Sequence, residues 1–401
     1  MIGDYVRRVT PQHSTLWKAT TPLLGRLDVE LTERCNLNCM HCYINQPAGD
    51  RQRQAREMTT GQVKAVLTEA AGLGALSVRF TGGEPLLRTD FADLYLFARR
   101  LGLRVVLFTN GTLLTPELAD LLARVPTLGG IQITVYGMTA ASYEAVTTVS
   151  GAFGAMRRGI DLLLERRVSF LVKGAYLPPT KNEMQAFQAW ATSLVPGGAP
   201  PTPVTLLTLR GRCDSSEKNE KIKAQRLTGE ESLHVPTREA EWYRNEMKQF
   251  CSKFMGPPGD RLFRCGAGRA ICVDAYGKVQ PCMLLRDPRV VYDLYGQEHL
   301  GEGSPPLRPS LQDALLNFFP RLSEMRATNA DYLARCARCF LHGLCEQCPA
   351  WSWMEHGTLD APVEYLCEIA HAQACELGLV AGGERAWEVA SWRERLGRLK
   401  T

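Results

Sequence analysis

Three cysteines lie close together near the start of the chain, in the segment CNLNCMHC. They are Cys35, Cys39 and Cys42, and they follow directly after a stretch with strand character, Arg26 to Thr32. Thiolates are the ligands that iron–sulfur clusters prefer, and a four-iron cluster is normally held by four of them. Three cysteines therefore leave one iron open, so this spacing predicts a cluster that binds a cosubstrate.

A zinc ion is the alternative occupant of this first site. Zinc binds cysteine and histidine together, and His41 would be the fourth ligand. His41 and Cys42 are adjacent in the chain, so their side chains diverge unless the backbone bends sharply. The spacing therefore favours the iron–sulfur cluster.

A second group of eight cysteines lies in the C-terminal part of the chain. Eight thiols are enough for two four-cysteine sites, which suit iron–sulfur clusters or, as in zinc ribbons, zinc. The 14 cysteines of the chain leave three others, Cys213, Cys251 and Cys375, which we expect to be inert thiols. Cys213 follows the last predicted strand and is also a candidate hydrogen-atom donor. The second group comprises Cys265, Cys272, Cys282, Cys336, Cys339, Cys345, Cys348 and Cys367.

The segments that must position the first site alternate between strand-like and helix-like patterns from Arg26 to Leu209. Alternation at this spacing predicts a parallel sheet with helical crossovers. About six such units are too few for a closed eight-stranded barrel, so we expect an α/β fold with a partial (β/α)6 TIM-like barrel. The expected strands are 26–32, 76–80, 104–108, 131–135, 168–176 and 204–209, and the expected helices are 59–73, 90–100, 153–165 and one that begins near Pro116.

Residues 82–85 (GGEP) end the second expected strand, where glycines permit close approach of the backbone to a ligand. Further along the chain, the polar segment 213–231 is predicted to be a linker or mobile loop. Residues 271–282 are predicted to form a hairpin with Gly277 at its turn.

The motif CNLNCMHCY resembles the C-x3-C-x2-C signature of the radical SAM superfamily, and GGEP is similar to a second motif of that family. The resemblance implies a [4Fe–4S] cluster whose open iron chelates the amino and carboxylate groups of S-adenosylmethionine (SAM). One-electron reduction of the sulfonium then yields a 5′-deoxyadenosyl radical, which abstracts a hydrogen atom from substrate. The cofactors carry this chemistry, and the protein positions and shields them.

The same resemblance implies contacts to SAM. His41 would pack near the adenine, the GGEP motif would contact the methionine amino group, and the Thr134 hydroxyl would bond the ribose or carboxylate. Tyr136 departs from the family pattern, so either this part of the pocket differs or Tyr136 faces a different substrate. The SAM-binding residues are then His41, Gly82, Gly83, Glu84, Pro85, Asn110 and Thr134.

The run FRCGAGRAICVDAYGKVQPC is similar to the SPASM extension of some radical SAM enzymes. The resemblance implies two auxiliary [4Fe–4S] clusters that are fully ligated, which suits electron transfer or structure, and metal loss should then unfold this region. One departure is the spacing of two residues before Cys348, where three are common. The first cluster would use Cys265, Cys272, Cys282 and Cys348, and the second Cys336, Cys339, Cys345 and Cys367.

This interpretation divides the chain into five parts. They are an N-terminal segment 1–25, the radical SAM partial barrel 26–212, a linker and bridging helix 213–260, a small Cys-rich SPASM domain 261–375 and a C-terminal helix 376–401.

The net charge of +5 with 22% charged residues gives no reason to expect a nucleic acid or a membrane surface as partner. The chain lacks a stretch of about twenty apolar residues and a secretory signal, so we expect a cytoplasmic protein. A cytoplasmic chain keeps its thiols reduced, and clustered cysteines there more often bind metal than form disulfides.

The expected function is that of a radical SAM oxidoreductase or maturase that oxidises or cross-links a peptide. One alternative is a dehydrogenase or epimerase of a small molecule such as a sugar or cofactor precursor. Another is a non-enzymatic iron–sulfur electron carrier or a zinc-stabilised scaffold. A reductant such as flavodoxin or ferredoxin is an expected partner. Because only 34 residues precede Cys35, we expect a ribosomal peptide either to use a separate leader-peptide-binding protein or to need none.

Overall fold

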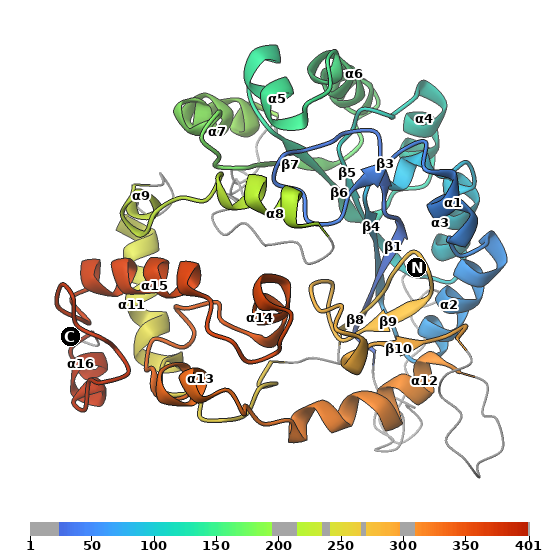
Figure 1. The fold of residues 1–401 in the computed structure, drawn as a ribbon. Coiled ribbons are helices and arrows are strands. Elements are labelled where there is room, and N and C mark those ends of the chain that lie inside the picture. The colour runs from blue at the N-terminus through green and yellow to red at the C-terminus, as the bar shows by residue number, and fades with distance from the viewer. Residues whose placement is uncertain (1–23, 195–214, 235–240, 266–269, 297–308, 400–401) are drawn as a thin grey trace, which may run out of the picture.

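A computed structural model describes residues 24–194, 215–234, 241–265, 270–296 and 309–399. Its centre is an eight-stranded sheet with the order β10-β9-β8-β1-β4-β5-β6-β7 (Figure 1). The strands from β1 to β7 in this order run parallel to their neighbours, as a partial α/β barrel requires. They are β1 (Arg26–Thr32), β4 (Ser77–Gly82), β5 (Arg104–Thr109), β6 (Leu128–Val135) and β7 (Phe170–Gly174).

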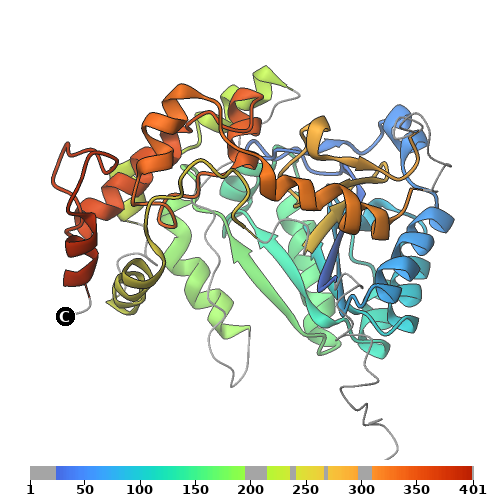
Figure 2. The same cartoon turned by 90° about the horizontal axis from the view of Figure 1, so that it is seen from below.

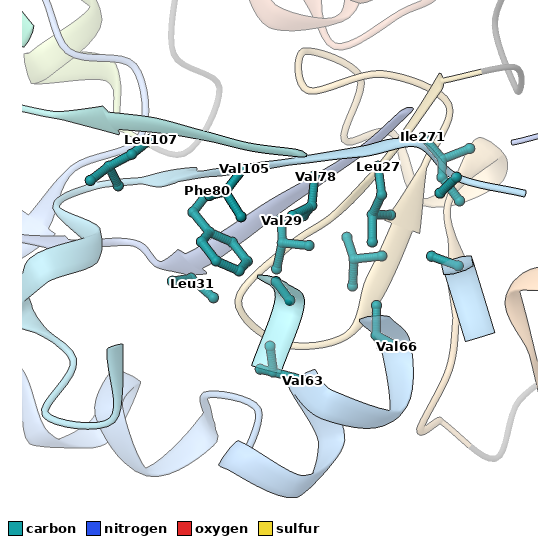
Figure 3. Packing of buried hydrophobic residues seen from close by; sticks show 14 of the residues in the cluster. Leu27, Val29, Leu31, Val63, Val66, Val78, Phe80, Val105, Leu107 and Ile271 are labelled. Carbon is teal, nitrogen blue, oxygen red and sulfur yellow. The ribbon is translucent and has the colours of Figure 1, made fainter. Parts of the chain in front are cut away.

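Helices cover the outer face of these strands (Figure 1). Figure 3 shows how Leu27 and Val29 of β1 pack against Val63 and Val66 of α2. Side chains alternate along a strand, so Asp28 on the same strand points to the inner face of the barrel. The covering helices are α2 (Thr60–Gly72), α3 (Phe91–Arg100), α4 (Pro116–Arg124), α5 (Ala140–Thr147), α6 (Ala152–Glu165) and α7 (Met184–Ser193).

The partial barrel predicted from the sequence is confirmed, and several element boundaries agree with the prediction. The strand at Arg26–Thr32 agrees at both ends, and Thr59 caps α2 with a capping box. Asp90 stands at the start of α3 without capping it, because its carboxylate binds Arg88 and Thr60 instead. Helix α5 was not predicted, and the expected strand at 204–209 lies outside the described residues.

The predicted hairpin is present and continues the barrel sheet. Strands β8 (Ala270–Val273) and β9 (Lys278–Gln280) pair antiparallel, with Gly277 at φ +84° in the turn, and β10 (Tyr292–Asp293) follows. Strand β8 also pairs in parallel with β1, so that Cys272 lies opposite Asp28. One continuous sheet therefore joins the barrel to the cysteine-rich region.

The prediction of a loop over 213–231 is wrong for the part that the structure describes. Helices α8 (Ser216–Lys223) and α9 (Gly229–Leu233) form there. Ser215 caps the first and Thr228 forms a capping box with the second, which are local signals for a helix start. Ile222 of α8 is buried in a small apolar cluster with Leu177, so the helix packs on the barrel.

The C-terminal region has a second apolar core. Phe340 and Leu341 pack there with Leu379, Val389 and Leu396, which come from the end of the chain. The segment 376–401 was predicted to be one helix. Among its described residues Glu376 ends α15, the other helical residues form α16, and the buried residues belong to this core. Figure 2 shows the red C-terminal helices on the side of the sheet away from the blue helices α2 and α3. The helices are α11 (Glu241–Phe254), α12 (Leu311–Asp313), α13 (Ala330–Ala334), α14 (Pro349–His356), α15 (Glu364–Glu376) and α16 (Trp392–Arg398).

Three short elements lie near the first cysteine group: β2 (Arg34–Cys35), β3 (Gln46–Pro47) and α1 (Arg51–Arg56). No helix among the described residues is long and apolar enough to cross a lipid bilayer.

Candidate functional site

The loop that carries the first three cysteines starts where β1 ends and closes on itself through the β2–β3 pair. Its backbone is docked on α5: the Asn38 and Met40 amides donate to the carbonyls of Thr147 and Val146, each at 3.0 Å. The Asn45 side chain donates to the Leu37 carbonyl at 3.3 Å and closes the loop from within. The loop is thus positioned by the protein itself.

The three thiols of this loop lie close enough to influence one another electrostatically. Burial raises the pKa of Cys35 to about 12, and it raises that of Cys39 well above its usual range. Cys35 accepts hydrogen bonds from the Leu37 amide (3.4 Å) and the Asn110 side chain (3.8 Å). Thiols that are buried but already supplied with donors ionise when a metal centre brings positive charge. The donor set therefore fits an iron–sulfur cluster.

An aromatic layer lies under the loop. The His41 ring meets the Tyr136 ring edge-on, with centroids 5.0 Å apart, and Tyr136 lies 6.0 Å from Tyr143. Burial lowers the pKa of His41 to about 4, so its imidazole is neutral. The Tyr136 hydroxyl donates to Cys39. Tyr136 thus supports the cysteine loop in this structure.

The glycines of the GGEP motif are explained by a close approach to the chain itself. A Cβ on Gly82, which has φ +123°, would lie 2.1 Å from the Thr32 carbonyl oxygen. A Cβ on Gly83 would lie 2.3 Å from the Arg34 carbonyl oxygen. The glycines thus make room for the backbone that leads into Cys35, and the predicted contact of this motif with a ligand stays a prediction.

Glu84 is fully buried and joins two loops. Its carboxylate accepts hydrogen bonds from the Thr109 hydroxyl (2.8 Å), the Asn110 amide (2.8 Å) and the Leu86 amide (3.1 Å). Burial raises its pKa to about 7. The side chain of Asn110, held in this way, reaches both Cys35 and Asn36 (2.9 Å). The structure thus brings residues 82–85 and Asn110 to the cysteine loop. Glu84 acts on the loop indirectly, through its hydrogen bond to Asn110.

Two further residues were predicted at the site: Thr134 as a SAM contact and Cys213 as a hydrogen-atom donor. Thr134 alternates with buried Ile133 and Val135 on β6, so it points to the inner face of the barrel. Cys213 lies outside the described residues.

A cleft of about 600 Å³ opens beside Cys35. Asn36, Asn38 and Asn45 line it, and Lys218 reaches it from α8. The Lys218 ammonium binds the side chains of Asn45 and Asn38, the latter at 3.3 Å. The sequence interpretation missed these residues. The asparagines lie in or next to the cysteine motif, whereas Lys218 lies in a segment that was expected to be a loop.

The second predicted auxiliary set surrounds a single cavity. Cys336, Cys339, Cys345 and Cys367 all line it, and burial raises the pKa of each of them. Zinc would bring its thiolates to roughly 3.8 Å from one another, given Zn–S bonds of about 2.3 Å. Among the described residues, no three Cys, His, Asp or Glu side chains converge closely enough to hold a single ion. Four thiols around one cavity are a donor set that a four-iron cluster accepts.

The first predicted auxiliary set is only partly gathered. Cys265 and Cys282 both act electrostatically on Cys348, which places these three together. Cys272 is fully buried on β8, and the charged groups that act on it most strongly are Glu30 and Arg286. The structure thus places Cys265 and Cys282 within electrostatic reach of Cys348 and leaves Cys272 facing the acidic end of β1.

The fold and the cysteine loop define a partial-barrel protein with a cluster site at the carboxyl end of its first strand. Residues 29–187 match the model of the radical SAM superfamily. Residues 29–187 thus form a radical SAM domain, and a cysteine-rich C-terminal region follows it in the chain.

Two curated relatives match different shares of the chain. An AdoMet-dependent heme synthase of Methanosarcina barkeri is 32% identical over 198 residues, which are 49% of this chain and 55% of that one. The mycofactocin maturase MftC of Mycolicibacterium smegmatis is 28% identical over 276 residues, 63% of this chain and 62% of that one. The chain thus spans 55% of one relative and 62% of the other.

A solved structure shares the fold over nearly the full length. It is native anSMEcpe with bound AdoMet and Cp18Cys peptide, with a TM-score of 0.55 at 13% identity, and the match covers 94% of this chain and 99% of that one.

Proposed function

We propose that this protein is a radical SAM enzyme that oxidises or cross-links a peptide. The observation that carries the proposal is the cysteine loop: its three thiols act on one another electrostatically, and Cys35 accepts two amide hydrogen bonds and borders a cleft of about 600 Å³. One relative is named as a maturase, and the similar solved structure holds both AdoMet and a peptide. Both support a peptide as the substrate class.

Cys35, Cys39 and Cys42 would hold the cluster, which with SAM supplies one-electron cleavage and a carbon-centred radical. The chain's own residues do the positioning. The Leu37 amide and the Asn110 side chain donate to Cys35, and Glu84 fixes Asn110. The layer of His41, Tyr136 and Tyr143 packs under the loop and excludes water from that side. His41, residues 82–85, Asn110 and Thr134 remain the proposed SAM contacts.

The eight later cysteines would hold two auxiliary clusters in the sets expected from the sequence. The cavity around Cys336, Cys339, Cys345 and Cys367 supports the second set. The grouping of Cys265, Cys282 and Cys348 supports the first, and Cys272 would have to turn toward them. We keep the domain limits at 26–212 and 261–375 as part of this proposal, along with a flavodoxin or ferredoxin as reductant and a separate leader-binding protein.

The test is iron content and SAM cleavage on protein reconstituted without oxygen. Three four-iron clusters predict roughly twelve irons per chain. We expect 5′-deoxyadenosine with dithionite, and none from Cys39→Ala. Iron near four with zinc in the remaining sites would remove the proposed electron acceptors. No 5′-deoxyadenosine under any reducing condition would contradict the enzyme and favour a carrier or scaffold.

A small molecule such as a cofactor precursor is the second candidate substrate, because one relative is named as a heme synthase. Hydrogen transfer from a deuterated substrate into 5′-deoxyadenosine distinguishes the two. Deuterium from a peptide supports the first proposal, and deuterium from a small molecule supports the second.

A further inference from the structure

A second cavity, of about 290 Å³, lies where the barrel meets the cysteine-rich region. We call it the seam cavity. Its lining includes Tyr43, next to Cys42, together with Gln280 of β9 and Trp353 of α14. Figure 1 shows α14 facing the β8–β9 hairpin at this place. Arg53 lines both the seam cavity and the cleft beside Cys35, so the two spaces adjoin.

The floor of the seam cavity holds a hydrogen-bond acceptor without a partner. Gln280 is only 1% exposed, and its Nε2 donates to the Asp274 carboxylate at 3.4 Å. This bond fixes the amide, because the reverse orientation would set two acceptors against each other. Its Oε1 has no hydrogen-bond partner among the described residues. A buried carbonyl left in this state costs about 1–3 kcal/mol, which a ligand N–H or O–H would recover.

Both cations inside the seam cavity are ion-paired, whereas two cations at its rim have no ion-pair partner among the described residues. Arg286 pairs with Glu30 at 2.6 Å and with Glu33 at 2.9 Å, and Arg53 also pairs with Glu33 at 2.9 Å. The inner cations are therefore neutralised. The floor itself adds the carboxylate of Asp274, whose amide neighbours hold it in place.

Arg56 and Lys278 stand at the rim, where both are exposed. Neither makes an ion pair with a residue that the structure describes. The Arg56 guanidinium lies over the Tyr276 ring, 5.0 Å from its centroid, which holds it beside the opening. Two cations without counter-ions at the mouth of a cavity favour an anionic group in a ligand.

We propose that the seam cavity binds an acidic residue of the peptide substrate, with its carboxylate between Arg56 and Lys278 and a neighbouring N–H donating to Gln280. This inference rests on the proposed function, because it assigns a binding site to the peptide substrate proposed there. A cavity of about 290 Å³ accommodates one or two amino-acid residues. The remainder of the peptide then extends toward the adjoining cleft, which brings it to the cysteine loop.

The experiment uses fluorescence anisotropy on the reconstituted enzyme with SAM, without oxygen. The probes are two labelled Gly–Ser peptides that differ only in two central residues, both Glu or both Gln. We expect the Glu peptide to bind at least roughly tenfold more tightly, and this preference to disappear in the R56Q/K278Q variant. The R124Q/K253Q variant loses the same charge at exposed positions away from the cavity and should keep the preference.

A third variant, Gln280→Met, removes the floor acceptor and should weaken both peptides by roughly three- to tenfold. If Gln280→Met loses iron, the R56Q/K278Q variant still tests whether the preference for the Glu peptide depends on the seam cavity. Equal binding of the two peptides by the unmodified protein, or an unchanged preference in R56Q/K278Q, would overturn the proposal. If free glutarate displaced the Glu peptide at equal concentration, the proposal that a peptide occupies the cavity would be wrong.

SAM cleavage is measured on the same preparation, so that the two proposals fail separately. A preserved preference for the Glu peptide without 5′-deoxyadenosine would contradict the proposed function alone. Normal 5′-deoxyadenosine formation with equal binding of the Glu and Gln peptides would contradict only the proposed role of the seam cavity.

Discussion

The first cysteine group and the later ones are held by the chain in different ways. The loop of Cys35, Cys39 and Cys42 is docked by backbone hydrogen bonds on α5 and by the close approach of Gly82 to β1. The later cysteines are spread over strand β8, helix α15 and the turns between short helices, and four of them surround a cavity. A site built on backbone pairing keeps its shape without metal, whereas a site built around a cavity depends on what fills it.

The largest effect should follow iron removal by an anaerobic chelator. Residues 336–376 should then lose amide protection on the order of 100-fold or more, because cluster binding supplies their folding energy. Strands β1, β4 and β5 should stay protected, since they pair directly with one another and β1 packs on α2. Hydrogen exchange measures both regions in one sample. An equal loss of amide protection in the barrel strands would show that the two regions do not differ in their dependence on iron.

Gly82→Ala should destabilise the barrel by about 3 kcal/mol, because its Cβ would overlap the Thr32 carbonyl at a positive φ. Denaturant unfolding without iron measures the change. Gly61→Ala is the matched control, because a Cβ there meets only the Thr59 hydroxyl oxygen at 3.9 Å within α2. It should stabilise by up to about 1 kcal/mol. Similar losses in both variants would argue against backbone docking of the loop.

Arg226→Met tests a contact that joins the two regions. Arg226 forms a buried ion pair with Glu355 of α14 and lies over the Tyr365 ring at 4.5 Å. Leaving Glu355 buried without its cation should cost about 3 kcal/mol in unfolding free energy. The double variant R226M/E355M should recover to within about 1 kcal/mol of the unmodified protein. Failure to recover would mean that the loss comes from packing on Tyr365.

Thr59→Ala should have the smallest effect, about 1 kcal/mol, because it removes the capping box of α2. The loss should be the same with and without iron if the barrel folds independently of the clusters. Thr68→Ala, an exposed change within the same helix, should be close to neutral. A Thr59→Ala loss that depends on iron would show that the two regions unfold together.

The local parts of this fold were predictable because their signals are local. The apolar strand from Arg26 to Thr32 and the threonine cap of α2 need only a few adjacent residues. The spacing of the first three cysteines likewise indicates a cluster, because it involves only neighbouring residues of one loop. The helices at 216–223 and 229–233 also have local caps, but their polar composition outweighs those signals unless the burial of Ile222 is known.

The sequence by itself determined the cysteine pattern, the alternation of strands and helices, and the small residues at the end of the second strand. Only the tertiary structure decided that Gly82 accommodates the backbone of Thr32, that β8 continues the barrel sheet beside β1, and that Lys218 reaches the cleft. The physical reason is that periodicity and caps act over a few residues. Strand pairing and charge balance join residues far apart in the chain, as Arg286 and Glu30 show, and only folding brings them together.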